Sequence, residues 1–164
     1  MGCDIHAYIE YGPTAVEREL GTKQWVGFFG AIHLDRDYSL FAALSNTRND
    51  GEIDPVCEPR GLPATVSGWV QAENTLLVSE SEKNEPGCTP KDRAEQWVEG
   101  GSSQWVDAQR SRITHPDWHS HSWVSPEEFE EAMQRAKCTS PVARATLASL
   151  RELPNAILVF WYDN

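Results

Sequence analysis

The chain has 164 residues, 40% of them hydrophobic, and a formal net charge of −11. This size suits one domain with a real core, and the acidic balance disfavours extended nucleic-acid binding because it repels phosphate backbones. No stretch approaches the roughly 18 uninterrupted apolar residues that cross a bilayer, so no membrane span is expected.

The four cysteines indicate a reducing compartment. Cys3, Cys57, Cys88 and Cys138 are far apart in the sequence, and none forms a Cys-x-x-Cys pair. A thiolate zinc site or a redox motif is therefore not expected. The sequence also lacks a basic segment followed by an apolar one, so no signal peptide is expected and the predicted location is the cytoplasm.

In the first half of the chain, alternation of apolar and polar residues predicts a strand over 3–11. Gly12-Pro13 ends it, and the polar stretch to Lys23 predicts a hairpin loop before a second strand at 25–29. Apolar residues at spacings of three predict a short helix over 37–47. Residues 49–63 are rich in proline and glycine and predict a loop.

In the second half, a short strand is expected at 75–79. Thr89-Pro90 predicts the start of a helix that ends before Gly100-Gly101, and residues 102–116 show no clean period. Ser125 and Glu128 form a capping-box pattern that predicts a helix to about residue 137. A further helix is expected over 140–153, followed by a buried strand at 156–162.

These elements predict an α+β fold. Its small mixed or antiparallel sheet should contain the N-terminal and C-terminal strands, with three to four helices packed on it. We expect a single domain over residues 1–164, with an insertion-like region at about 68–115.

Two segments combine carboxylates with imidazoles. Asp4 and His6 lie two residues apart on the first predicted strand, so their side chains share one face. If residues 117–123 are extended, Asp117, His119 and His121 also share one face. The alternatives are a solvated strand face for the first segment, and for the second a polar loop whose histidines bind backbone carbonyls.

If the two segments meet, Asp4, His6, Asp117 and His119 could hold one divalent metal ion, with zinc or manganese as the expected metals. The same groups could instead act without metal as a general acid and base. His121 is then a candidate catalytic acid or base. Asp163, near the end of the last predicted strand, is a second candidate, with a solvated terminus as its alternative.

Candidate ligand-binding residues complete this site. Arg60 lies between Pro59 and Gly61 in a restricted loop that can present a guanidinium to a phosphate, although an ordinary turn with a surface arginine is the alternative. Arg36 is a second candidate for phosphate, and Trp118 is a candidate for stacking on a base.

Several blocks resemble a family of small, mostly uncharacterised proteins encoded by tailed bacteriophages and prophages. They are Met1-Gly-Cys-Asp-Ile-His6, Arg36-Asp-Tyr-Ser-Leu-Phe41, Arg60-Gly-Leu-Pro63, His119-Ser-His-Ser-Trp123 and Val159-Phe-Trp-Tyr-Asp-Asn164. Members of that family carry a glycine at the position of Trp118, and this chain is longer between Pro63 and Asp117. The resemblance implies a phage origin and a host-cytoplasmic setting, but no established reaction.

Three functions fit these observations. The first is a metal-assisted, phosphodiesterase-like hydrolase of a nucleotide or phosphoester; by analogy with other phage proteins, its substrate could be a signal of host immunity. The second is a non-catalytic protein that sequesters such a nucleotide as an anti-defence sponge, often as a homo-oligomer. The third is an acidic mimic of nucleic acid that blocks a host enzyme.

Overall fold

The computed structural model describes residues 2–79 and 86–163 of the chain. Met1–Trp69 together with His119–Asn164 form a first compact unit, and Val70–Trp118 form a second one. The second unit covers nearly the same residues as the insertion-like region. No helix among the described residues has both the length and the apolar character that crossing a membrane requires.

A four-stranded sheet organises the first unit, with strand order β2-β1-β7-β6. Its strands are β2 (Val26–Ile32), β1 (Ile5–Tyr11), β7 (Ile157–Asp163) and β6 (Trp118–Val124). β1 is antiparallel to both neighbours, and His6 lies directly opposite Trp161 of β7. The first and last strands therefore lie side by side at the centre of the sheet.

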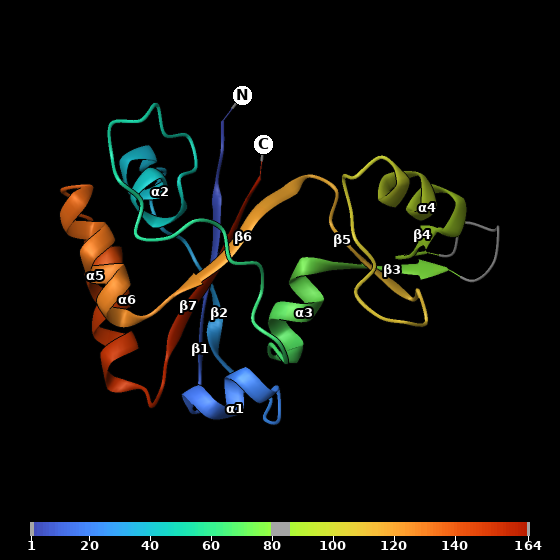
Figure 1. Cartoon of the computed structure of the whole chain (residues 1–164), viewed down its shortest axis with the longest axis horizontal. Helices are drawn as coiled ribbons and strands as arrows, with labels where there is room; N and C mark the ends of the chain where they lie inside the picture. The colour runs from blue at the N-terminus through green and yellow to red at the C-terminus, as the bar shows by residue number, and fades with distance from the viewer. Residues whose placement is uncertain (1, 80–85, 164) are drawn as a thin grey trace. The chain divides into compact units, whose positions relative to one another are not determined.

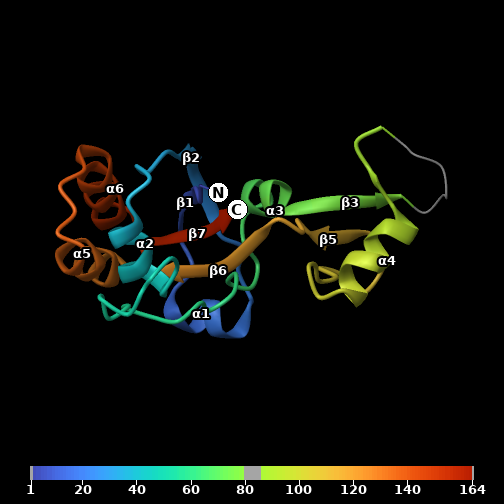
Figure 2. The ribbon, with the colours of Figure 1, turned by 90° about the horizontal axis from the view of Figure 1, so that it is seen from above.

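Three helices cover one face of this sheet: α2 (Tyr38–Ser45), α5 (Pro126–Arg135) and α6 (Pro141–Glu152). Figures 1 and 2 both show them on the same side of the strands. α5 begins with the predicted capping box, in which the Ser125 side chain accepts from the Glu128 amide. The predicted α+β class, with both end strands in the sheet, is confirmed.

The two faces of the sheet have different chemistry because side chains alternate along each strand. Cys3, Ile5, Ala7 and Ile9 point into the main hydrophobic core with the three helices, and so does Tyr162 of β7. We call this the core face. The second face carries the alternate positions of the same strands, including His6, Tyr8, Glu10 and Trp161.

The second unit has a three-stranded sheet of order β4-β3-β5, formed by β4 (Thr89–Pro90), β3 (Thr75–Ser79) and β5 (Arg112–Thr114). β3 pairs with β4 in parallel and with β5 in antiparallel orientation. The helices here are α3 (Gly68–Asn74), which begins in the first unit, and α4 (Lys91–Glu99). The fully buried Ile113 of β5 fixes the short strand to the unit's core.

Three local predictions are wrong. The connection between the antiparallel strands β1 and β2, expected to be a loop, contains α1 (Ala15–Leu20), a short helix that has a Thr14–Glu17 capping box and buries no side chain. The segment expected to be irregular contains β5, which is too short to show a period. The helix predicted to start at Thr89-Pro90 is α4 and ends before Gly100 as expected, but it begins at Lys91 and has no side-chain cap, while Thr89 and Pro90 pair with β3.

Candidate functional site

Asp163, the last residue of β7, binds β1 through both backbone and side chain. Its Oδ1 accepts a hydrogen bond from the Asp4 amide at 2.9 Å, and its Oδ2 lies 3.0 Å from Nε2 of His6. Burial raises the pKa of Asp163, but the hydrogen bonds from Asp4 and His6 outweigh this effect, so the net pKa is lowered. Asp163 is therefore an ionised carboxylate fixed against one imidazole nitrogen.

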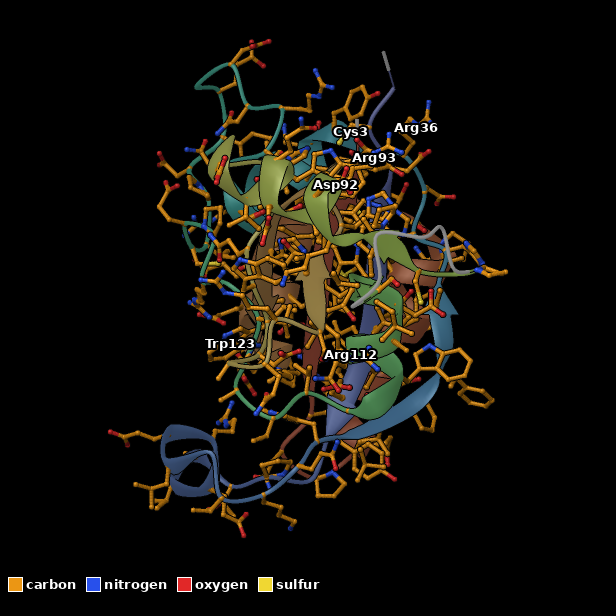
Figure 3. All side chains as sticks on the ribbon, turned by 90° about the vertical axis from the view of Figure 1, so that its right-hand side faces the viewer. Cys3, Arg36, Asp92, Arg93, Arg112 and Trp123 are labelled. Atoms are coloured by element: carbon orange, nitrogen blue, oxygen red, sulfur yellow. The ribbon has the colours of Figure 1, made fainter. Side chains whose placement is uncertain are left out.

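Arg36, in the loop before α2, binds the side chain of Asp4. Its Nε and Nη2 donate to the two carboxylate oxygens of Asp4 at 2.7 and 2.6 Å. The hydrogen bond to Asp4 raises the pKa of Arg36, and the positive charge helps to lower the pKa of Asp163. Figure 3 shows Arg36 close to Cys3, near the start of β1. Because this ion pair is exposed, an anionic ligand can compete with Asp4 for the guanidinium.

The indole of Trp161 joins two imidazoles on the second face. Trp161 is fully buried and stacks on His6 of β1 with centroids 5.9 Å apart, and on His121 of β6 with centroids 5.7 Å apart. Tyr8 also stacks on this indole, at 5.1 Å. The two imidazoles therefore stack on the same indole, one from β1 and one from β6. We call His6, His121, Trp161 and Asp163 the two-histidine site.

The two histidines have different electrostatic surroundings. Burial, and to a lesser extent the neighbouring His119, lowers the pKa of His121 from 6.5 to about 4. His121 is therefore neutral at pH 7. His6, by contrast, lies against the Asp163 carboxylate, with its Nε2 3.0 Å from Oδ2 of Asp163. Such an unequal pair is the arrangement that general acid–base catalysis requires.

A single residue in β6 separates His119 from His121. Ser120 has φ of 53°, a left-handed conformation that breaks the strand's alternation. As a result His119 stacks on Tyr162, on the core face, at a centroid distance of 6.0 Å, whereas His121 stacks on Trp161. Because Trp161 and Tyr162 are consecutive on β7, the two histidines lie on opposite faces. The expectation that they share one face is wrong.

On the core face His119 joins buried polar groups rather than ligands. Its Nδ1 is 2.9 Å from Oγ of Ser120, and its Nε2 is buried without a hydrogen-bond partner among the described residues. The phenol of Tyr162 accepts from Ser45 at 3.2 Å. Burial raises the pKa of Tyr162 strongly, so this phenol stays neutral.

Of the four predicted metal ligands, Asp4, His6 and His119 belong to the first unit, but they have different partners. Asp4 binds Arg36, His6 binds Asp163, and His119 lies on the core face. The fourth, Asp117, is in the second unit, where its carboxylate is 3.9 Å from His115. Within residues 2–79 and 86–163, no three side chains of histidine, cysteine, aspartate or glutamate gather closely enough to hold a metal ion.

Arg60 fixes its loop to α5. Its guanidinium makes two hydrogen bonds to the Glu128 carboxylate, at 2.9 and 2.5 Å, and lies 4.8 Å above the indole of Trp123. Burial raises the pKa of Glu128, but hydrogen bonds from Arg60 and Ser125 outweigh it, so the net pKa is lowered. The guanidinium of Arg60 therefore already has an ionised carboxylate partner.

One candidate of the sequence analysis, Trp118, lies in the second unit, and one residue of the two-histidine site, Trp161, was not predicted. Trp118 stacks on His115 at 4.5 Å, within the second unit. Trp161 was not predicted, because the apolar run of β7 shows a buried strand but not which side chains face the histidines. The register of β1 with β7, in which His6 lies opposite position 161, would have identified Trp161.

Glu10 is a buried charge on the second face that the sequence analysis also missed. It is fully buried, and both carboxylate oxygens lie 3.1 Å from the Ser67 amide. Burial raises the pKa of Glu10, and the hydrogen bonds from Ser67 only partly offset this. The alternation of β1 already placed Glu10 on the face of His6.

Comparison with models of known protein families, with curated proteins and with solved structures returned no match. The functional inference therefore comes from the geometry of the side chains.

Proposed function

We propose that the chain is a phosphodiesterase-like hydrolase that cleaves a nucleotide or related phosphoester by general acid–base catalysis at the two-histidine site. The observation that carries this proposal is the pair of imidazoles stacked on one indole, with the Asp163 carboxylate against His6. Phosphoester hydrolysis needs a base for the attacking water and an acid for the leaving oxygen.

The surroundings assign the roles. His121, neutral at pH 7 because burial lowers its pKa to about 4, takes a proton from the attacking water as the new phosphorus–oxygen bond forms. His6, held by Asp163, donates a proton to the leaving oxygen as the old phosphorus–oxygen bond breaks. Proton exchange with solvent then resets both imidazoles.

Arg36 is the cation of this site. It is close enough to Asp163 to lower that residue's pKa, and its pair with Asp4 is exposed. A substrate phosphate would replace the Asp4 carboxylate on the same face of the guanidinium, since both anions suit its two-pronged geometry. Asp4 then holds Arg36 in position while the site is empty.

The metal-assisted route expected from the sequence does not fit these residues. Asp4, His6 and His119 are directed to three different partners, and His119 is on the opposite face from His6. We therefore derive no step through a metal ion. Zinc or manganese dependence is tested directly by the chelator arm of the experiment below.

The test incubates the full chain with a panel of linear and cyclic nucleotides, with and without EDTA, and follows product formation by chromatography. We expect cleavage that survives EDTA and falls by on the order of 100-fold in His6→Gln and in His121→Gln. His33→Gln is the matched control, because His33 is an exposed histidine outside the site.

Three outcomes would overturn the proposal. Loss of activity in EDTA, restored by zinc or manganese, would favour the metal-assisted hydrolase. Tight binding with every nucleotide returned intact would favour the non-catalytic sponge. Full activity in both histidine variants would place the chemistry elsewhere.

A further inference from the structure

Arg18 of α1 is held between two tryptophans of the first unit. Its guanidinium carbon lies 5.7 Å from the ring centroid of Trp25 and 5.6 Å from that of Trp123. Both distances are within the range of cation–π contacts. The guanidinium of Arg18 therefore lies within cation–π range of two indoles.

The N–H groups of Arg18 have no acceptor among the residues that the structure describes. No carboxylate lies within ion-pair distance of Arg18 there, although Arg36, Arg60 and Arg151 all have one. The Nε1 atom of Trp25 is also buried without a partner within the same residues. The N–H groups of this half-buried guanidinium are therefore open to a ligand that supplies acceptors.

Two hollows meet at this guanidinium. One has a volume of about 370 Å³ and is mostly apolar, lined by Ala15, Arg18, Glu19, Pro63, Ala64 and Trp123. The other, of about 330 Å³, is more polar and includes Ser125, Asn155 and Arg151 beside Arg18. Each hollow also has one carboxylate, Glu19 in the first and Glu127 in the second. Volumes of this size suit a small organic molecule.

We propose that Arg18 is the centre of a second binding site, which takes a phosphate carried on a flat apolar body. The phosphate accepts hydrogen bonds from the guanidinium edge, and the body occupies the apolar hollow beside Pro63 and Trp123. An arginine that already packs against two indoles loses less side-chain entropy on binding, which favours recognition of an oxyanion. This site contains none of the residues of the two-histidine site and goes beyond the proposed function.

The test measures binding of phenyl phosphate to the full chain by calorimetry and by shifts of the tryptophan indole N–H signals in NMR spectra. Inorganic phosphate tests the contribution of the phosphate alone, and phenol tests the contribution of the apolar body alone. We expect phenyl phosphate to bind most tightly, and Arg18→Gln to weaken it at least tenfold. Arg18→Lys keeps the charge but loses the flat guanidinium with its several donors. Its affinity for phenyl phosphate should lie between that of the natural chain and that of Arg18→Gln.

Arg110→Gln is the matched control, because Arg110 also lies over an indole, 5.6 Å from the ring of Trp105, but lines neither hollow. It should bind phenyl phosphate as the natural chain does, and so should His6→Gln, which separates this site from catalysis. Unchanged affinity in Arg18→Gln and Arg18→Lys, or phenol binding as tightly as phenyl phosphate, would overturn the proposal. If Arg18→Gln does not fold, Arg18→Lys decides the outcome.

Discussion

The buried, neutral His121 should make the stability of the chain depend on pH. In the unfolded chain its pKa is the ordinary 6.5, whereas burial lowers the folded-state pKa to about 4. Below pH 6.5 the unfolded state therefore binds a proton that the folded state does not. Its contribution to stability is fully present above pH 6.5 and is lost as the pH falls toward 4.

The size of the effect follows from the two pKa values. A tenfold difference in proton affinity corresponds to about 1.4 kcal/mol, so the change from 6.5 to about 4 corresponds to roughly 3 kcal/mol. His121→Gln removes the titrating group. We expect the free energy of unfolding of the natural chain to fall by about 3 kcal/mol more than that of the variant between pH 7.5 and pH 4.

Urea unfolding at half-unit pH intervals, followed by tryptophan fluorescence, measures this difference. The slope of free energy against urea should be the same for both chains, so that the midpoints report stability alone. His33→Gln controls for the loss of a histidine from the unfolded chain and should follow the natural curve. Parallel curves for the natural chain and His121→Gln would refute the claim that His121 is buried in its neutral form.

Three other substitutions test neighbouring parts of the structure. Asp163→Asn should lower turnover by on the order of 100-fold with a smaller change in KM, because it releases His6 while leaving Arg36 in place. Steady-state kinetics measures both parameters. The raised pKa of Glu10 means that its folded carboxyl favours the proton, so stability is lost as pH rises above 4.5; Glu10→Gln should abolish that loss in urea titrations at pH 4 to 8. Ser125→Ala should cost about 1 kcal/mol in thermal unfolding, through the lost helix cap.

The sequence was most informative where a pattern repeats over a long element. The alternation of β1, the apolar run of β7 and the capping boxes at Thr14 and Ser125 are all visible without coordinates, although the first box was overlooked. The corner formed by Asp4, His6 and Asp163 was partly predictable, because two strands of opposite direction at the centre of a sheet bring the start of one beside the end of the other.

Each prediction from the sequence that failed did so for a physical reason. The face on which His119 lies depends on the backbone conformation of Ser120, and nothing in a His-Ser-His triplet specifies a left-handed serine. The partners of Arg36 and Arg60 are carboxylates of distant residues, Asp4 and Glu128, so their engagement is a property of tertiary structure. Trp161 looks like any other core residue until its register with His6 is known.

The hydrogen bonds that hold His6 and Asp4 to Asp163 join residues 157 and 159 positions apart. Contacts of such long range are among the last to become available during synthesis, because β7 is the final strand of the sheet to be made. A growing chain thus contains the imidazole of His6 before it contains the carboxylate that orients this imidazole. The proposed chemistry should therefore start only when the sheet is closed by its last strand, which keeps incomplete chains inert.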